Sequence, residues 1–319
     1  MANLTPLGRT TIIVSWVATT LAFISLALSL ASHIHVRRSL AITEYLTYAA
    51  FLIGVILIAQ NTFAILVEGQ AEHQTQLRDS QINTLAKSIL LHEALWSLVN
   101  ALIRISACLL ILKIFGVVRK LRYCMVPAIC LSTLHALACV LDLLLICRPI
   151  SAQWRAEVNA VCGNQKLSFI ILESTAIALD FIIVVAPIYP LSKVKHGKIS
   201  LWKFYLTFEI GAVLFIIAGL RLKALSYATS LDFIYSKSYL GLLSALGVMM
   251  GITICVVPKI PGILKMLRYV SREYMGSLNL VSEKLKIRVE QSLVVIYETE
   301  AEGKSQQLSS CERKSSDPR

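Results

Sequence analysis

Seven long apolar runs constrain this chain more than any other feature of its sequence. Each run is close to or above the roughly 20 residues that an α-helix needs to cross a hydrocarbon layer about 30 Å thick. The runs are continuous and do not alternate with period two, so they predict helices and not the strands of a membrane barrel. Their approximate limits are residues 10–32, 45–67, 88–115, 124–148, 167–191, 204–226 and 240–264. The sequence therefore predicts an all-α fold, a seven-transmembrane helix bundle.

The composition agrees with a membrane protein. Of the 319 residues, 56% are hydrophobic and 16% are charged, whereas soluble domains average roughly 45–50% apolar and about 25% charged residues. A soluble enzyme is therefore excluded as the default. The net charge of +12 is spread over loops and forms no single stripe. We therefore expect the lipid bilayer as a partner and no nucleic acid.

Lysine and arginine indicate the orientation of the bundle. They concentrate in the first, third and fifth connections between the runs, which the positive-inside rule assigns to the cytoplasm. We therefore expect the amino end outside and a cytoplasmic carboxyl tail, in the plasma membrane or the endoplasmic reticulum. The sequon at Asn3 then lies on the side of the membrane where glycosylation occurs.

Three domains follow from the distribution of apolar and charged residues. Residues 1–265 form the predicted transmembrane domain. Residues 266–297 mix apolar side chains with alternating charges, which is typical of an amphipathic segment on the inner membrane surface. Residues 298–319 are rich in Glu, Lys, Ser and Gln, which indicates a disordered tail.

Two of the eight cysteines lie at or just beyond the outer end of the fourth run. In an oxidising lumen Cys147 and Cys162 could close this loop as a disulfide, and two free thiols are the alternative. The other cysteines show neither a C-x-x-C pair nor a metal-ligand spacing with histidine. We therefore expect no metal site.

Ionisable side chains inside the runs are the candidate functional residues, because each costs at least about 2.5 kcal/mol at the bilayer centre unless it is paired or hydrated. One helical face of the third run carries Glu93, Ser97, Asn100 and Arg104. Such a polar stripe must face the interior of the bundle.

The fourth, fifth and sixth runs contribute further charges. His135 and Asp142 are seven residues apart and share a helical face, as do Glu173 and Asp180. A rise of 1.5 Å per residue gives the depth of each charged residue along its helix. Four of them lie at one level, about 8–9 Å below the outer surface. These are Glu93, Asp142, Glu173 and Arg221. Arg104 and Asp180 lie deeper, at levels that allow an ion pair.

These positions predict a polar pocket in the outer half of the bundle. Three carboxylates around Arg221 cannot all stay ionised comfortably in a low dielectric, so one could hold a proton and donate it. Under this hypothesis Glu93, Asp142 and Glu173 are catalytic candidates. The binding candidates are Asn100, Arg104, Asp180 and Arg221. The alternative is that all these residues pair with one another and only hold the helices together.

Comparison with retinal proteins and G-protein-coupled receptors gives little support. The third run ends Leu112-Lys113-Ile114-Phe115 with no D-R-Y motif, and the last run has no N-P-x-x-Y. A retinal Schiff base needs a lysine deep in the last run, but Lys259 and Lys265 lie near its inner end. We therefore expect no retinal and no other cofactor.

Several short strings resemble the fungal rhodopsin-domain integral membrane family, the one named after a satratoxin-cluster protein. They are Arg38-Ser39-Leu40, Glu44-Tyr45-Leu46, Arg104-Ile105-Ser106, Lys113-Ile114-Phe115, Cys147-Arg148-Pro149, Cys162-Gly163, Pro187-Ile188 and Pro258. The chain departs from the family pattern in having Thr43-Glu44 where relatives often have two acids, and in lacking an acid in the last run. The resemblance implies a fungal, multi-pass protein, often encoded in a secondary-metabolite cluster.

Three classes of function follow. The first is a membrane protein of secondary-metabolite biosynthesis, for instance a membrane-embedded cyclase or isomerase that acts on a lipophilic terpenoid or polyketide intermediate with an acidic residue as proton donor. The second is a receptor-like sensor that binds a small ligand in the same pocket. The third is a transporter or a structural membrane subunit.

Overall fold

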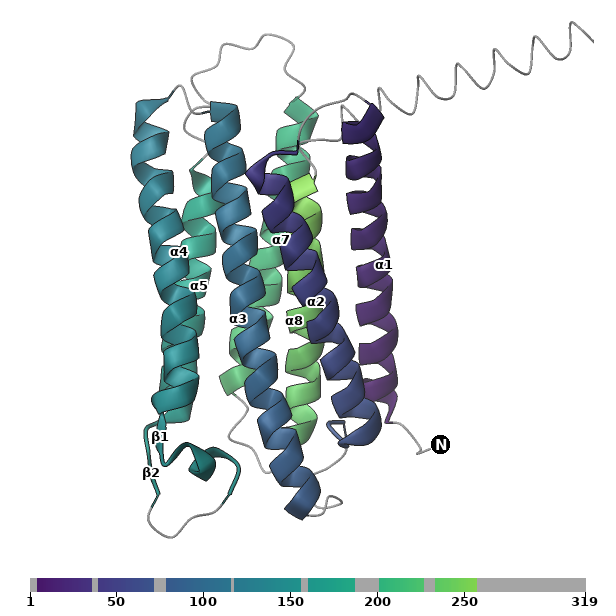
Figure 1. Cartoon of the computed structure of the whole chain (residues 1–319), viewed down its shortest axis with the longest axis vertical. Coiled ribbons are helices and arrows are strands. Elements are labelled where there is room, and N and C mark those ends of the chain that lie inside the picture. Colours follow the sequence, from purple (N-terminus) through teal and green to yellow (C-terminus); the bar gives the residue numbers. More distant parts are fainter. Residues whose placement is uncertain are drawn as a thin grey trace, which may run out of the picture. The chain divides into compact units, whose positions relative to one another are not determined.

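The computed structural model describes residues 5–35, 40–71, 79–115, 118–155, 160–186, 201–226 and 233–256. These residues contain seven long helices that lie side by side in one bundle (Figure 1). The helices are α1 (Pro6–His35), α2 (Ile42–Val67), α3 (Asp79–Phe115), α4 (Arg119–Leu145), α5 (Gln165–Val185), α7 (Leu201–Ser226) and α8 (Phe233–Val256). Within the described residues, six of them are long and apolar enough to cross a membrane, all except α7. The chain is thus a multi-pass helical membrane protein.

Each predicted run corresponds to one helix, but the ends differ. Helix α3 begins at Asp79 and α8 at Phe233, both well before the apolar runs that predicted them. Hydropathy records only the apolar stretch, whereas backbone hydrogen bonds continue the helix through polar residues. The segments predicted at 266–297 and 298–319 lie outside the described residues, as does Asn3.

The link between α4 and α5 marks one end of the bundle, which we call the disulfide end. Strand β1 (Cys147–Arg148) pairs antiparallel with β2 (Val161–Cys162), and the 3₁₀-helix η2 (Ile150–Gln153) lies between them in sequence. A disulfide with an S–S distance of 2.02 Å joins Cys147 to Cys162. The amino end of α1 lies at this same end (Figure 1).

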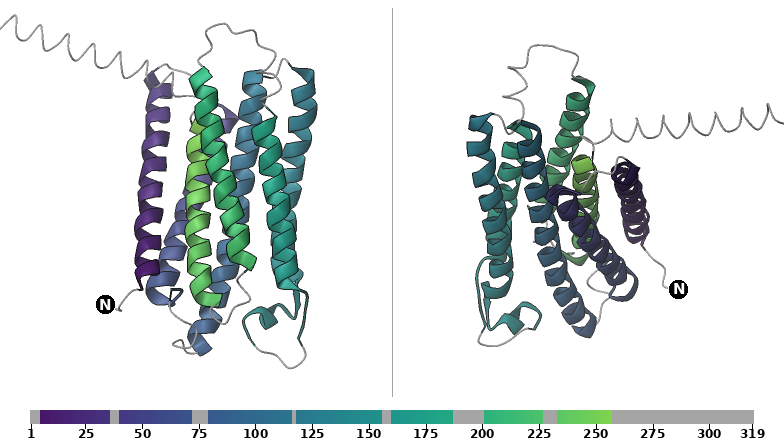
Figure 2. Two further views of the ribbon diagram at one scale, coloured as in Figure 1. Left: turned by 180° about the vertical axis from the view of Figure 1, so that it is seen from behind. Right: turned by 45° about the horizontal axis from the view of Figure 1, so that its top comes forward.

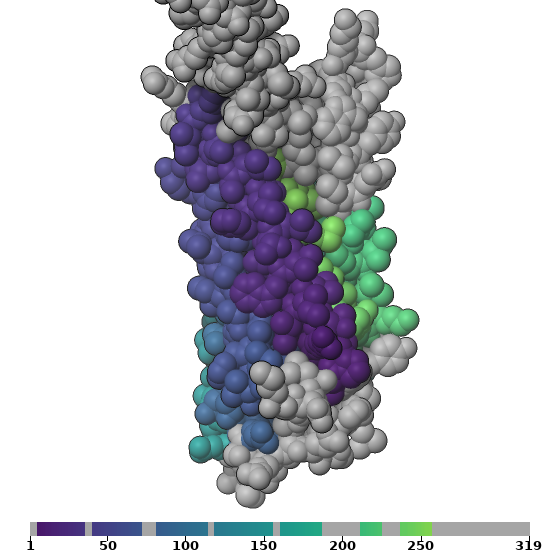
Figure 3. Space-filling view, turned by 90° about the vertical axis from the view of Figure 1, so that its right-hand side faces the viewer, coloured from purple at the N-terminus to yellow at the C-terminus, as the bar shows by residue number. Residues whose placement is uncertain are grey.

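Helix α8 forms the centre of the bundle. It contacts α1, α2, α3 and α7, and Figure 2 shows it between α1 and α7 from behind. In its span 61% of the residues are buried, compared with 39% or less in the other candidate spans. Figure 3 shows α1 covering part of α8 on one flank. The polar residues Lys237, Ser238 and Ser244 of α8 are therefore buried against protein neighbours.

Glycines allow α8 and α2 to approach closely. A Cβ added to Gly241 of α8 would lie 2.7 Å from Oδ1 of Asn61 on α2. A Cβ added to Gly54 of α2 would lie 3.2 Å from Cγ1 of Val248 on α8. Small residues at such contacts let helix backbones pack tightly in a membrane, where lipid gives no hydrophobic driving force for association.

Polar side chains join the helices at the opposite end. A carboxylate oxygen of Glu44 accepts a hydrogen bond from the backbone N–H of Ala41 at the start of α2, and its other oxygen lies 3.4 Å from Nε2 of His33 on α1. Ser106 of α3 donates to the carbonyl oxygen of Thr43 at 3.0 Å and lies 2.8 Å from the hydroxyl oxygen of Thr47. These contacts fix α1, α2 and α3 relative to one another.

Candidate functional site

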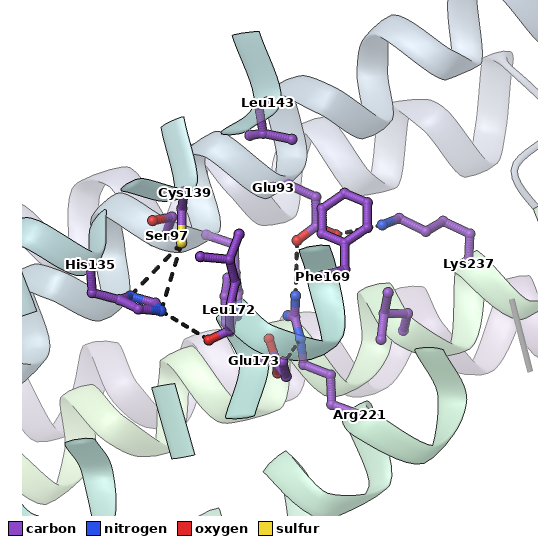
Figure 4. Close-up of a pocket in the computed structure, with 12 residues that line it drawn as sticks. Glu93, Ser97, His135, Cys139, Leu143, Phe169, Leu172, Glu173, Arg221 and Lys237 are labelled. Atoms are coloured by element: carbon purple, nitrogen blue, oxygen red, sulfur yellow. Dashed lines mark hydrogen bonds and ion pairs between the residues drawn. The ribbon is translucent and has the colours of Figure 1, made fainter. Parts of the chain in front are cut away.

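The guanidinium of Arg221 is the centre of a buried ion-pair network near the disulfide end. Arg221 lies on α7 and is 5% exposed. Its Nη2 lies 2.9 Å from Oε2 of Glu93 on α3, and its Nε lies 2.8 Å from Oε1 of Glu173 on α5. The planar guanidinium has donors on two edges, so a single side chain can bind two carboxylates from different helices (Figure 4).

Lys237 extends the network to a fourth helix. Its Nζ contacts Oε1 of Glu93 from α8, and the side chain is buried. Arg221 also donates to the hydroxyl of Ser244, two turns along α8 from Lys237. We define the ion-pair network as Glu93, Glu173, Arg221 and Lys237. Two acids and two bases balance in formal charge, which lowers the cost of burying them.

An aromatic ring completes the surroundings of Arg221. The guanidinium carbon lies 3.5 Å from the ring centroid of Trp96, one turn after Glu93 on α3. A guanidinium over an indole face gains a cation–π attraction of about 2 kcal/mol when both groups are desolvated. Trp96 therefore holds the Arg221 side chain in the plane from which it reaches both carboxylates.

A small cavity adjoins the network. It has a volume of about 40 Å³ and is lined by all four network residues together with groups from α3, α4 and α5. This is enough space for about one water molecule. The hydroxyl oxygen of Ser97 lies in this wall, is buried, and has no hydrogen bond to any described residue. The cavity can therefore hold a water or one polar group of a ligand.

The α4 and α5 side of the cavity contains a histidine and a thiol. Nε2 of His135 lies 2.9 Å from the carbonyl oxygen of Leu172. Because a carbonyl only accepts, this ring nitrogen carries the hydrogen. The thiol of Cys139 lies 3.8 Å from Nδ1 of the same ring. His135 and Cys139 of α4 therefore form part of the cavity wall. Figure 4 shows them across the cavity from Lys237.

The structure does not bring Asp142 into this cavity, where its depth along the helix had predicted it. Its carboxylate accepts a hydrogen bond of 2.5 Å from the hydroxyl of Ser168 on α5 and does not line the cavity. The depth estimate along α4 did not include the rotation of the helix about its axis. Helix α4 packs against α3 and α5, so the Asp142 face meets the start of α5 and not Arg221 on α7.

Arg104 and Asp180 form the expected ion pair, away from the cavity. Nε and Nη2 of Arg104 lie 2.7 and 3.0 Å from the two carboxylate oxygens of Asp180. This bidentate pair joins α3 to α5. Asn100 does not reach the cavity, because its amide donates to the carbonyl oxygen of Trp96 at 2.8 Å within its own helix. The polar stripe of α3 thus serves two separate contacts.

Among the described residues, no cluster of three or more His, Cys, Asp or Glu side chains is arranged to hold a metal ion. The charged side chains of the site can form ion pairs and hydrogen bonds and can bind polar groups.

A family model described as the fungal rhodopsin domain matches residues 28–266. The match includes all four network residues and most of the bundle. The chain belongs to the fungal rhodopsin domain family. No curated protein and no solved structure matches it. The family assignment confirms the resemblance drawn from short motifs, while the satratoxin-cluster type stays a prediction.

Two site residues of this fungal rhodopsin domain escaped the sequence analysis. Lys237 precedes the predicted run at 240–264, so hydropathy places it in a connection, whereas α8 already begins at Phe233. Its spacing of seven residues from Ser244 could have indicated a shared inward face. Trp96 is three residues after Glu93 and so lies on the same face, which was a usable signal.

Proposed function

We propose that this fungal rhodopsin domain protein is a receptor-like membrane protein that binds a small polar ligand in the cavity beside the ion-pair network. The observation that carries the proposal is the position of Arg221, which pairs with carboxylates of α3 and α5 at 2.9 and 2.8 Å while lining the cavity. A ligand in the cavity meets the group on which the contacts of four helices depend.

The proposed mechanism is an exchange of ion-pair partners. A ligand carboxylate would compete with Glu93 for Lys237 or Arg221, and a ligand ammonium would compete with Lys237 for Glu93. Either exchange removes one interhelical contact and replaces it with a contact to the ligand. A ligand shifts the bundle between two arrangements only by its difference in affinity for them. In this proposal the ion-pair network supplies the difference in affinity, because a bound ligand replaces one of its interhelical ion pairs.

The proposal includes the orientation predicted from lysine and arginine. The disulfide between Cys147 and Cys162 supports it, because disulfides persist in the lumen and outside the cell and are rare in the cytosol. With the disulfide end outside, the cavity is closer to the exterior, where a sensor would meet its ligand. Asn3 would then be a glycosylation site, in the plasma membrane or the endoplasmic reticulum.

The interpretation as a cyclase or isomerase has less support. Both carboxylate oxygens of Glu93 face cations, and Glu173 pairs with Arg221. A proton donor must instead face its substrate. The cavity of about 40 Å³ can take one polar group of a ligand but has no room for the carbon skeleton of a terpenoid or polyketide. A role in secondary metabolism stays a prediction from family resemblance.

Ligand binding can be tested with purified protein in nanodiscs. Wild-type protein and Asp142→Asn are titrated with small carboxylates, amines and amino acids, and thermal unfolding is followed by circular dichroism. We expect at least one compound to raise the melting temperature of both proteins and to have no effect on Arg221→Lys or Lys237→Gln. Asp142→Asn is the matched control, because it alters a carboxylate outside the cavity.

Two results would contradict the receptor proposal. If no compound changes the melting temperature, or if the change persists in Arg221→Lys and Lys237→Gln, the network only holds the helices together. The enzyme interpretation has a separate test: microsomes containing the protein are incubated with lipophilic terpenoid or polyketide precursors, and the products are analysed. Conversion that Glu93→Gln abolishes would replace the receptor proposal with the enzyme one.

A further inference from the structure

A second and larger pocket lies between α3 and α4, under the disulfide loop. We call it the lateral groove. It has a volume of about 280 Å³, close to the lower limit of about 300 Å³ for small-molecule sites. Its defining residues are Lys87, Leu91 and Ala94 of α3, Leu144 of α4, and Ile150 and Trp154 of the loop.

The groove opens sideways toward the lipid. Leu91 and Leu144 on its rim are 53% and 50% exposed. Apolar side chains at this depth of a membrane-spanning bundle contact acyl chains. The α3 residues Lys87, Leu91 and Ala94 lie on one helical face, so they form a continuous wall from the disulfide end toward the membrane interior.

A single cation stands at the end of this wall. Nζ of Lys87 lies 5.4 Å from the ring centroid of Trp154. Within the described part of the chain, Lys87 forms no ion pair with a carboxylate. Lys87 comes directly before the apolar run that begins at residue 88 and lies next to an aromatic ring, a position typical of the level of the lipid headgroups. The groove therefore combines an apolar cleft with one positive charge at its headgroup end.

We propose that the lateral groove binds a long-chain fatty acid from the bilayer, with its carboxylate at Lys87 and its chain along α3 and α4. Charge complementarity selects the acid, because Lys87 is the one charged side chain among the described residues that line the groove. The volume suits a single chain. The inference goes beyond the proposed function, because Lys87 and Trp154 belong to the groove and not to the ion-pair network.

The test uses Trp154 as a reporter in the full-length protein reconstituted in nanodiscs. Stearic acid that carries bromine beside its carboxyl group is titrated into the protein, because this end of the molecule would lie next to Lys87 and Trp154. The bromine quenches the fluorescence of a tryptophan that it contacts. We expect saturable quenching that Trp154→Phe removes. The methyl ester of the same acid should need about a fivefold higher concentration for half-quenching, because it lacks the charge that pairs with Lys87. Lys87→Gln should remove this difference.

A matched pair of variants tests the groove itself. Ala94→Phe fills the groove and should abolish the saturable quenching, whereas Leu52→Phe, at an exposed position of α2 outside the groove, should leave it unchanged. If acid and ester quench wild-type protein equally, or if Ala94→Phe has no effect, the quenching reports ordinary bilayer lipid and the proposal is wrong. The acid–ester comparison needs no variant, so it remains valid if Ala94→Phe fails to fold.

Discussion

A single buried side chain, Arg221, connects four helices near the disulfide end. Its guanidinium contacts Glu93, Glu173, Ser244 and the ring of Trp96, and so joins α7 to three other helices. Lysine cannot reproduce this, because its ammonium is a point charge without two donor edges. Removing one member of such a network leaves another buried charge without its partner, which costs about 3–5 kcal/mol.

The two carboxylates of the network should differ in their contribution to stability. Glu93 pairs with Arg221 and Lys237, whereas Glu173 pairs with Arg221 alone. We therefore expect Glu93→Gln to lower the free energy of unfolding by about 3–5 kcal/mol and Glu173→Gln by less. Melting temperatures in nanodiscs measure both changes. Asp142→Asn should change the free energy of unfolding by less than about 1 kcal/mol. Equal effects of all three variants would contradict this ranking.

The sequence predicted three of the four network residues. Glu93, Glu173 and Arg221 followed from spacing and depth along the helix axes, because a charge inside an apolar run must find a partner. Asp142 satisfied the same rule but finds its partner in Ser168. The rotation of a helix about its own axis depends on packing against its neighbours, and the spacing of residues along one helix does not contain it.

At the scale of elements, the helices follow from hydropathy but their contacts do not. Each apolar run became a helix, because a membrane leaves the backbone no other partners for its hydrogen bonds. The runs did not indicate that α8 occupies the centre, since the six candidate spans have similar mean hydropathies of 2.0 to 2.3. The central position of α8 is indicated instead by its small residues, such as Gly241, which allow α2 to pack closely against it.

A glycine substitution tests the packing of α8 against α2. The added methyl group in Gly241→Ala would lie 2.7 Å from Oδ1 of Asn61, which itself accepts a hydrogen bond from Gln70 at 3.1 Å. We expect a loss of about 1–3 kcal/mol in the free energy of unfolding. The control is Gly219→Ala on α7, where an added Cβ meets nothing within 4 Å. That variant should be neutral or more stable by up to about 1 kcal/mol. A stabilised Gly241→Ala protein would show that the contact is loose.

At the scale of the whole molecule, one covalent link closes the connection between α4 and α5. The disulfide spans 15 residues in sequence, and closing a loop of this length restricts the unfolded chain by about 3 kcal/mol. We expect the double variant Cys147→Ser/Cys162→Ser to have a lower melting temperature under non-reducing conditions. The reducing agent dithiothreitol should lower the melting temperature of wild-type protein and leave that of the double variant unchanged. Equal sensitivity of both proteins would contradict the prediction.

The orientation of the bundle is a further prediction at this scale. In sealed microsomes whose cytoplasmic face is outward, a protease should remove an epitope tag at the carboxyl end. A tag at the amino end should be cleaved only after detergent opens the vesicles. Immunoblotting of the two tagged proteins measures both outcomes. Protection of the carboxyl tag would reverse the orientation and place the cavity beneath the cytoplasmic surface.

Leu143 belongs to both hollows, since its side chain lines the small charged cavity on one side and the lateral groove on the other. Leu143 therefore separates the polar cavity from the apolar lateral groove. If a fatty acid binds in the lateral groove as proposed, its acyl chain would pack against Leu143 and restrict its rotamers on the side that faces the charged residues. The acyl composition of the membrane should therefore change the affinity of the charged cavity for its ligand. A cell that changes its lipids would then also change ligand binding by this protein.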